Sequence, residues 1–306
     1  MFSFHPLSDA TRHLLLAGGL DPDAVAATVR MTVSEDLAGG ADVTSVATVP
    51  ADQRSIGEFV ARRAGIVAGL AVAAAVVETV CGADATNLNL RVADGDRVEP
   101  AQVVASVEAP TRLLLTAERS ALNLLCHISG VATLTRQWAD ALEGTGAVVR
   151  DTRKTMPGLR ALQKYGVRCG GGANHRMALS DAALVKDNHV LAAGGVAEAF
   201  AAVRRLAATL PVEIEVDSLD GLREAIDAGA DVVLLDNFEP DQMESAVAIR
   251  NELRREVILE ASGGLTLALA RRVGETGVDY IAVGELTHSV TVFDIGLDLR
   301  SVSTRR

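Results

Sequence analysis

The chain has 306 residues, a formal net charge of −11 and an aromatic content of only 3%. Apolar residues make up 49% of it, which is enough for a sizeable core and excludes a disordered chain. An acidic protein with few aromatic rings is a poor match to duplex nucleic acid and to single strands alike. We therefore expect a folded protein that does not bind nucleic acid.

Three cysteines are spread along the chain at Cys81, Cys126 and Cys169, and no CxxC motif occurs. This spacing predicts neither a disulfide framework nor a zinc site and is typical of a reducing compartment. The first residues lack the charged and apolar regions of a signal peptide, and the longest apolar run, residues 65–77, is too short to span a bilayer. We expect a cytoplasmic protein without membrane segments.

The first half of the chain contains helical patterns and short strand patterns in separate groups, which is typical of an α+β arrangement. Asp21 is expected to cap a helix whose first residue is Pro22. The expected helices are residues 9–17, 22–31, 68–80 and 116–134, and the expected strands are residues 55–60, 88–92, 97–98 and 103–107.

From residue 147 onward, short apolar runs alternate with helical segments. Continuous apolar runs spaced in this way predict parallel strands that are covered on both faces. A closed eightfold barrel needs about 200 residues and roughly 160 remain here, so we expect an incomplete or open barrel. The expected strands are AVV, AALV, VEIEV, VVLL, VILEA and YIAV, which end near Asp151, Lys186, Glu215, Asp236, Ser262 and Gly284.

Polar residues follow these strands, and in an α/β barrel the carboxyl ends of the strands meet at one rim. Lys186 comes directly after Leu184 and Val185, so we expect it to be buried and functional. A single strand-end acid such as Asp217 is explained equally well as a helix cap. The residues expected at the rim are Asp151, Thr152, Arg153, Lys154, Lys186, Asp187, Glu213, Glu215, Asp217, Asp236, Asn237, Ser262, Gly263, Gly264, Gly284 and Glu285.

Residues 150–189 carry eight Lys and Arg against three Asp, which gives a local charge of +5 in an acidic chain. Such a concentration of cations predicts an anion site. Arg160, Lys164 and Arg168 recur at four-residue spacing, which also fits the solvated face of an ordinary helix. Arg153 and Lys154 do not fit that alternative, because they closely follow an apolar run.

The loops ASGG and VGE after the last two strands are rich in glycine. Backbone N–H groups in such loops can hold a phosphate, although a tight turn explains them equally well. Glu215 and Asp236 lie on neighbouring expected strands, and two carboxylates together with phosphate oxygens are a common seat for Mg²⁺. The residues thus predict polyanionic substrates, one of them a phosphate ester, with Mg²⁺ as cofactor.

The block RDTRKTMPGLRALQKYGVRCGGGANHRMALSDAALVKDNH resembles the central motif of the quinolinate phosphoribosyltransferase family. The stretches EVDSL, LLDNF, ASGG and YIAVGELTHSV are similar to the rest of its barrel. The stretches AERSALNLLCHISGVATLT and EDLAGGADVTS resemble its N-terminal half. The resemblance covers nearly the whole chain, from residue 35 to residue 299, and the AGGAD turn is longer than the family's usual Gly-Asp turn.

This resemblance implies a type II phosphoribosyltransferase-like α/β fold with two domains. An N-terminal α/β sandwich would occupy residues 1–125, an open, seven-stranded α/β barrel residues 126–290, and the tail 291–306 would return to the first domain. It also implies a homodimer or higher homo-oligomer with a shared active site. The implied reaction joins quinolinate to 5-phosphoribosyl 1-pyrophosphate and yields nicotinate mononucleotide, pyrophosphate and CO₂, on the route to NAD.

The resemblance further implies a role for individual residues. Lys154, Lys186, Glu215 and Asp236 are expected to be catalytic, with Mg²⁺ and the ribose at Glu215 and Asp236. Arg119 is expected to reach the active site of the neighbouring chain. The carboxylates of quinolinate would be held by Arg119, Arg153, His175 and Arg176, and the 5′-phosphate by Ser262, Gly263, Gly264 and Gly284.

Three alternatives remain at this point. A Schiff-base aldolase would use Lys186 but has no need of Arg119, Arg153 and Arg176. A paralogous phosphoribosyltransferase would act on another pyridine acid or serve molybdate metabolism, and the intact TRK and NHR motifs argue against it. A non-catalytic binding protein with the same fold would not need the complete set of charged rim residues.

Overall fold

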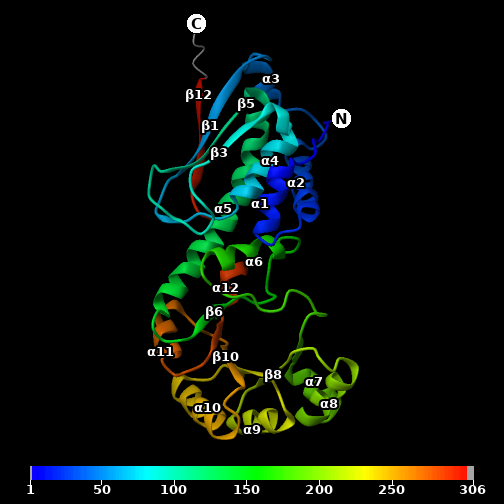
Figure 1. Cartoon of the computed structure of the whole chain (residues 1–306), viewed down its shortest axis with the longest axis vertical. Coiled ribbons are helices and arrows are strands. Elements are labelled where there is room, and N and C mark those ends of the chain that lie inside the picture. Colours follow the sequence, from blue (N-terminus) through cyan, green and yellow to red (C-terminus); the bar gives the residue numbers. More distant parts are fainter. Residues whose placement is uncertain (1, 302–306) are drawn as a thin grey trace. The chain divides into compact units, whose positions relative to one another are not determined.

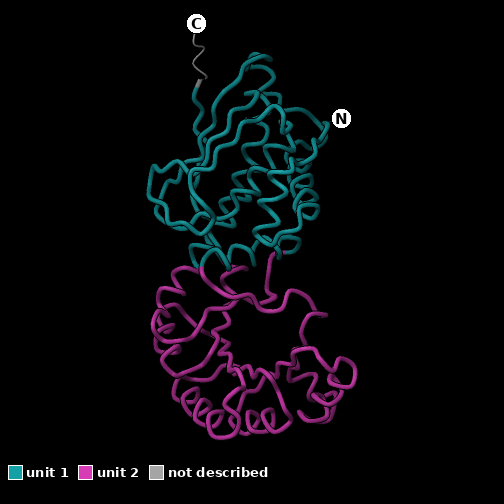
Figure 2. Tube along the Cα trace, viewed as in Figure 1, with its two compact units in different colours: residues 1–134, 157–170, 290–306 teal, residues 135–156, 171–289 magenta. Residues whose placement is uncertain are grey.

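The computed structural model describes residues 2–301 and divides the chain into two compact units (Figure 2). Unit 1 contains residues 1–134, 157–170 and 290–306, and unit 2 contains residues 135–156 and 171–289. The boundary expected at residues 125 and 126 falls inside the continuous helix α5 (Thr111–Ala141), and the two compact units divide this helix after residue 134. Residues 157–170 join unit 1 although they lie between two parts of unit 2 in the sequence.

Unit 1 is built on a four-stranded antiparallel sheet with the order β12-β1-β5-β3. Strand β12 comes from the end of the chain and pairs with β1, for example Phe59 with Leu297. The tail after residue 290 therefore belongs to the same unit as the N-terminal half. The strands are β1 (Arg54–Ala61), β3 (Asn87–Leu90), β5 (Val103–Pro110) and β12 (Ile295–Ser301), with a separate pair β2 (Gly65–Ile66) and β4 (Arg97–Val98).

Helices pack against this sheet and enclose the core of unit 1, in which Leu15, Val76 and Leu114 are fully buried. Helix α2 begins as predicted at Pro22 with the Asp21 carboxylate accepting from the Asp23 N–H, but it ends at Leu37 rather than residue 31. The remaining helices of this unit are α1 (Asp9–Ala17), α3 (Val43–Thr48), α4 (Leu70–Cys81), the 3₁₀ turn η1 (Ala83–Ala85) and α6 (Arg160–Cys169).

Helix α6 corrects one expectation about charge. The spacing of Arg160, Lys164 and Arg168 fitted the alternative of a solvated face, but Lys164 is fully buried. Arg168 does point outward, and its guanidinium donates to the carbonyl of Gly18. The four-residue spacing identified the shared face of the helix but not which part of it faces solvent.

Unit 2 contains a six-stranded parallel sheet with the order β6-β11-β10-β9-β8-β7. Strands β6 and β7 are the two edges and do not pair with each other, so the expected open barrel is confirmed. A single parallel bridge from Arg150 to Ala173 takes the place of a seventh strand, where the family resemblance implied seven. The strands are β6 (Val148–Arg150), β7 (Ala183–Val185), β8 (Val212–Val216), β9 (Val232–Asp236), β10 (Ile258–Ser262) and β11 (Tyr280–Ala282).

Helices connect successive strands and cover the outer face of the sheet (Figure 1). All strand pairs in this sheet are parallel, so the carboxyl ends of the strands lie at one edge, as expected. No helix in residues 2–301 is both long and apolar enough to cross a membrane. The helices are α7 (Asp187–Ala193), α8 (Val196–Leu206), α9 (Leu219–Ala228), α10 (Pro240–Leu253), α11 (Ala270–Gly274) and α12 (Glu285–His288), with the 3₁₀ turn η2 (Leu267–Leu269).

Candidate functional site

A pocket of about 330 Å³ opens at the carboxyl edge of the parallel sheet. All six strands of unit 2 contribute to it, either from their own residues or from the residues that follow them directly. Nine of the residues proposed from sequence meet in this pocket. Its lining consists of Thr152, Arg153, Lys154, His175, Arg176, Leu184, Lys186, Glu215, Leu234, Asp236, Glu260, Ser262 and Ala282.

Two arginines in this wall are positioned to bind an anion. The Nε atoms of Arg153 and Arg176 are buried and have no hydrogen-bond partner within the described chain. Burial lowers the pKa of Arg176, and the positive charge of Arg153 lowers it further. A negatively charged ligand would relieve both the mutual repulsion and the loss of hydration. One end of Arg176 is fixed, because its guanidinium donates to the carbonyl of Ala182 at 2.9 Å.

The loop after β6 is held by its own hydrogen bonds and by helix α12. The hydroxyl of Thr152 accepts from the Lys154 N–H at 3.0 Å, and the hydroxyl of Thr287 donates to the Lys154 carbonyl at 2.8 Å. A Cβ on Gly284 would lie 3.2 Å from Cδ of Lys154, so this glycine lets the lysine side chain pass close to the backbone. These contacts orient Lys154 toward a pocket that it lines.

Lys186 and Glu215 form an ion pair across the strand ends, with Nζ 2.5 Å from Oε2. The Lys186 side chain is 46% exposed, so the expectation that it is buried was wrong. Strand β7 ends at Val185, and Lys186 lies beyond it at the start of α7, where its side chain reaches over the edge of the sheet. Lys186 still lines the pocket, now as an accessible cation.

Asp236 is oriented by the residue that follows it. The side-chain amide of Asn237 donates to Oδ2 of Asp236 at 2.8 Å, and the Asn237 N–H donates to the carbonyl of Ser262 at 2.9 Å. Asn237 adopts a left-handed backbone conformation with φ of 57°, which is uncommon for a residue other than glycine and is found where a site requires it. This residue therefore ties the end of β9 to the loop after β10.

The residues predicted for phosphate binding lie at the ends of β10 and β11, but not all of them line the pocket. Ser262 does. Gly263 and Gly264 have positive φ of 88° and 60°, which leaves their backbone free of a Cβ in a turn. Gly284 precedes the short helix α12, and the Glu285 carboxylate accepts from the indole N–H of Trp138 at 3.3 Å.

Arg119 lies outside the pocket lining. It is an exposed residue of α5 and lines a groove of about 610 Å³ whose described walls all come from unit 1. Met31, Leu122 and Phe293 are among the apolar residues of that groove. Arg119 thus lines a groove of unit 1, whereas the other proposed quinolinate ligands line the pocket of unit 2.

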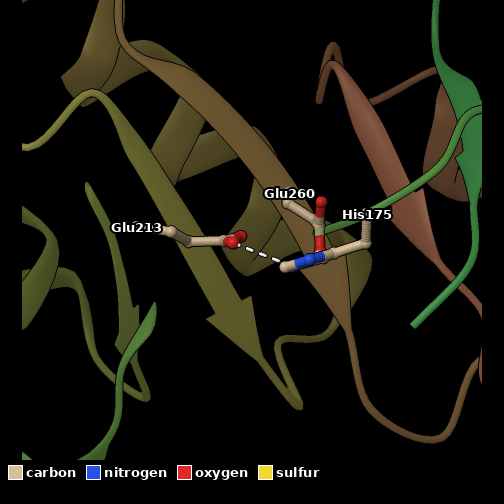
Figure 3. Close-up of side chains that lie close together, drawn as sticks. All are labelled: His175, Glu213 and Glu260. Carbon is tan, nitrogen blue, oxygen red and sulfur yellow. Dashed lines mark ion pairs between the residues drawn. The ribbon is translucent and has the colours of Figure 1, made fainter. Parts of the chain in front are cut away.

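A charged cluster of His175, Glu213, Glu260 and Arg150 adjoins the pocket, which His175 and Glu260 line. The first three side chains are buried and point toward one another (Figure 3). Nε2 of His175 is 2.9 Å from Oε2 of Glu213 and 3.7 Å from Oε1 of Glu260. Arg150 pairs with Oε2 of Glu260 at 2.6 Å and stacks on the ring of Tyr280. The sequence had assigned His175 to the substrate, but in this structure its ring is engaged within the protein.

His175, Glu213 and Glu260 have the composition of a metal site, since one donor atom of each lies within 4.8 Å of the others. The hydrogen bonds of His175 favour a hydrogen on its Nε2 rather than a metal ion at that atom. Its Nδ1 accepts from the Arg176 N–H at 2.7 Å, so a neutral ring carries its hydrogen on Nε2 and donates it to Glu213. A nitrogen that carries a hydrogen cannot bind a metal. The cluster is therefore a hydrogen-bonded network.

Burial and the neighbouring Glu213 carboxylate together raise the pKa of Glu260 to about 7, against the opposing effects of Arg150 and His175. Sequence reasoning noted Glu213 without a role and passed over Glu260. The signal was present in VILEAS, because an acid within an apolar strand, two residues before Ser262, shares the face of that rim residue.

The segment that carries His175 and Arg176 is fixed by a buried acid. Asp151 accepts from the His175 N–H at 2.9 Å and from the side-chain amide of Asn174 at 2.6 Å. Because Asp151 immediately precedes Thr152, the same residue sets the position of both pocket walls.

Comparison with known proteins shows strong similarity along most of the chain. Residues 42–129 match the N-terminal domain described as quinolinate phosphoribosyl transferase, and residues 131–298 match the corresponding C-terminal domain. The chain is 52% identical over 277 residues to a carboxylating nicotinate-nucleotide pyrophosphorylase of Mycobacterium leprae, covering 90% of this chain and 98% of the relative.

Two further relatives extend this similarity. A decarboxylating quinolinate phosphoribosyltransferase of Nicotiana tabacum is 36% identical, with 89% of this chain and 81% of the relative covered. The solved structure of the nicotinate-nucleotide pyrophosphorylase from Francisella tularensis superimposes with a TM-score of 0.86 at 36% identity, covering 91% of this chain and 96% of that one.

Proposed function

Because the chain belongs to the quinolinate phosphoribosyltransferase family, we propose that it transfers the phosphoribosyl group of 5-phosphoribosyl 1-pyrophosphate to quinolinate. The reaction releases pyrophosphate and CO₂ and leaves nicotinate mononucleotide, a precursor of NAD. The free cysteines Cys81, Cys126 and Cys169 support a reducing, cytoplasmic location.

The observation that carries this proposal is the pair Arg153 and Arg176. Both line one pocket, and the buried Nε of each lacks a hydrogen-bond partner among the described residues. Quinolinate is a planar dicarboxylate, and a guanidinium group matches a carboxylate with two parallel hydrogen bonds. Lys154 and Lys186 add two further cations to the same pocket.

Catalysis of the transfer is mainly a matter of position and charge. The pyridine nitrogen attacks the ribose carbon that bears the pyrophosphate, and the developing positive charge on the sugar needs a nearby anion. Glu215 and Asp236 are the pocket acids at the strand ends, and both are oriented, by Lys186 and Asn237 respectively. Ser262 and the following glycines offer a turn that suits the 5′-phosphate.

We also propose that the reaction requires Mg²⁺ at Glu215 and Asp236. Each carboxylate uses one oxygen in a protein contact among residues 2–301, on Lys186 and on Asn237, and has a second oxygen for a cation. Bound there, Mg²⁺ would neutralise the pyrophosphate as it leaves. Activity should disappear in excess EDTA and return when Mg²⁺ is restored. Full turnover in metal-free enzyme, verified by metal analysis, would contradict this requirement.

Further, we propose a homodimer or higher oligomer in which Arg119 of one chain binds quinolinate in the pocket of its partner. Two observations support this arrangement. Arg119 is exposed on unit 1, and it does not belong to the pocket lining of unit 2. A dicarboxylate beside only the cations of one chain would lack this third guanidinium.

One assay tests the main proposal against its alternatives. Purified enzyme receives 5-phosphoribosyl 1-pyrophosphate and Mg²⁺ with either quinolinate or nicotinate, and nicotinate mononucleotide and pyrophosphate are quantified. We expect nicotinate mononucleotide to form with quinolinate and not with nicotinate. The opposite result would favour a paralogous activity. Trapping of a keto substrate on Lys186 by borohydride would favour the aldolase.

A further inference from the structure

The decarboxylation requires a proton, and the structure contains a buried group that is suited to supply it. This inference rests on the proposed function. After transfer, the bond between the ring carbon C2 and its carboxylate breaks, and the electron pair stays on C2 beside the cationic ring nitrogen. The product carries hydrogen at that carbon, so one proton must reach C2 inside the pocket.

Glu260 is one of the three acids that line the pocket, and its side chain is fully buried. Arg150 holds its Oε2 at 2.6 Å, while its Oε1 has no hydrogen-bond partner in the described structure. Oε1 of Glu213 is also buried and without a partner there. Donor atoms of these two acids and of His175 lie within 4.8 Å of one another, so the nearby charge of Glu213 favours a proton on Glu260.

We propose that Glu260 is a catalytic acid that holds this proton and delivers it to C2 as CO₂ leaves. The O–H bond of the carboxyl group breaks, a C–H bond forms with the electron pair left on C2, and Glu260 becomes a carboxylate stabilised by Arg150. Water restores the proton after the products leave, so the acid is unchanged over one turnover.

The surroundings of the cluster offer a route for that restoration. A second cavity of about 320 Å³ is lined by Arg150, His175 and Glu213 among others, while Glu260 lines the substrate pocket. His175 lines both cavities, and its Nε2 lies between the two acids. Water in the second cavity can therefore reprotonate the pair from the side away from the substrate.

The charged groups that face Glu260 determine when it holds its proton. Glu213 on β8 favours the protonated form, whereas Arg150 on β6 and His175 beside it favour the carboxylate. Burial and Glu213 together keep the pKa of Glu260 well above its ordinary value. The acid thus carries its proton in most molecules below about pH 7 and in a falling fraction above it.

The test compares the two chemical steps in a single turnover, with wild-type and Glu260→Gln enzyme in excess over carboxyl-labelled quinolinate. Pyrophosphate reports phosphoribosyl transfer, and labelled CO₂ reports decarboxylation. In the variant we expect CO₂ release to slow about 100-fold relative to pyrophosphate formation, because a positioned acid contributes roughly that factor or more. The dicarboxylated mononucleotide should accumulate. Glu244→Gln, the same change at an exposed residue of α10, is the matched control.

The outcomes separate the inference from the function on which it rests. CO₂ that keeps pace with pyrophosphate in Glu260→Gln overturns the role of Glu260, whereas wild-type enzyme that forms no pyrophosphate overturns the proposed function. Should the variant fail to fold, the pH dependence of CO₂ release by the wild-type enzyme still tests the role of Glu260. Its CO₂ step should slow about tenfold for each pH unit above the pKa of Glu260, and a step that is flat from pH 6 to pH 9 overturns the proposal.

Discussion

At the scale of single residues, the two guanidinium groups of Arg153 and Arg176 dominate the pocket. Each has a buried Nε without a hydrogen-bond partner in the described chain, so these two cations repel each other and have lost hydration. An anion that accepts from both relieves these costs at once. Recognition here depends on the shape of the guanidinium fork as well as on its charge.

Arg153→Lys should therefore weaken quinolinate binding at least tenfold. The lysine keeps the positive charge but loses the paired N–H donors, and misfitting a buried charge pair costs about 2–5 kcal/mol. Calorimetric titration of quinolinate measures the change. Arg271→Lys, on the exposed helix α11, is the control. Equal affinity in Arg153→Lys and wild type would show that Arg153 does not contact the substrate.

Glu260 should make stability depend on pH in a way that Glu260→Gln removes. Its pKa rises from an ordinary 4.5 to about 7 in the folded protein, so its stabilising effect is complete below pH 4.5 and is lost as the pH rises through 7. Between pH 4.5 and pH 8 wild type should lose about 3 kcal/mol relative to the variant. Urea unfolding of both proteins across this range measures it. Parallel pH curves would refute the shift.

At the scale of elements, the backbone of the loop after β10 lies close to Asn237, the residue that follows β9. A Cβ on Gly263 would lie 2.2 Å from Oδ1 of Asn237, whereas a Cβ on Gly264 would meet nothing within 4 Å. Both glycines have positive φ, so alanine strains the backbone at either position. Only at Gly263 would the added Cβ also collide with the side chain of Asn237. That side chain donates a hydrogen bond to Asp236, so the collision would disturb Asp236 as well.

The neighbouring pair of variants Gly263→Ala and Gly264→Ala separates these two effects. Gly264→Ala should cost about 1–2 kcal/mol of stability from backbone strain alone. Gly263→Ala should in addition displace Asn237 and raise the KM for 5-phosphoribosyl 1-pyrophosphate at least fivefold more than Gly264→Ala does. Steady-state kinetics and thermal unfolding measure both quantities. Identical KM values in the two variants would remove the proposed link between the two loops.

At the scale of the whole molecule, the proposed ligands of quinolinate are divided between the two units. Arg153, His175 and Arg176 line the pocket of unit 2, and Arg119 lines a groove of unit 1. An isologous dimer places the same residue of each chain against the same site of its partner, so it would complete two equivalent pockets.

Complementation tests this arrangement. Arg119→Ala and Lys186→Ala homodimers should each be nearly inactive. In a heterodimer of the two, one site carries both substitutions and the other carries neither. Free exchange makes about half of the dimers mixed, so about a quarter of all sites should regain wild-type turnover. Verified heterodimers no more active than the parents would show that Arg119 acts within its own chain or not in catalysis.

The amino-acid sequence by itself determined the class of fold and most of the pocket. Parallel strands follow from continuous apolar runs, and their polar ends must meet at one edge whatever the details of packing, so Arg153, Glu215 and Asp236 could be placed together. Local signals were equally dependable, as with Asp21 and Pro22 at the start of α2. These features depend on neighbouring residues alone.

Only the tertiary structure decided what depends on contacts between distant segments. Lys164 is buried and Lys186 is accessible, the reverse of what their local sequences indicated, because burial is set by the elements that pack around a residue. Glu260, Glu213 and His175 come from separate segments, so neither their proximity nor the raised pKa of Glu260 is visible in the sequence. Periodicity gives the face on which a side chain lies, and packing decides what that face meets.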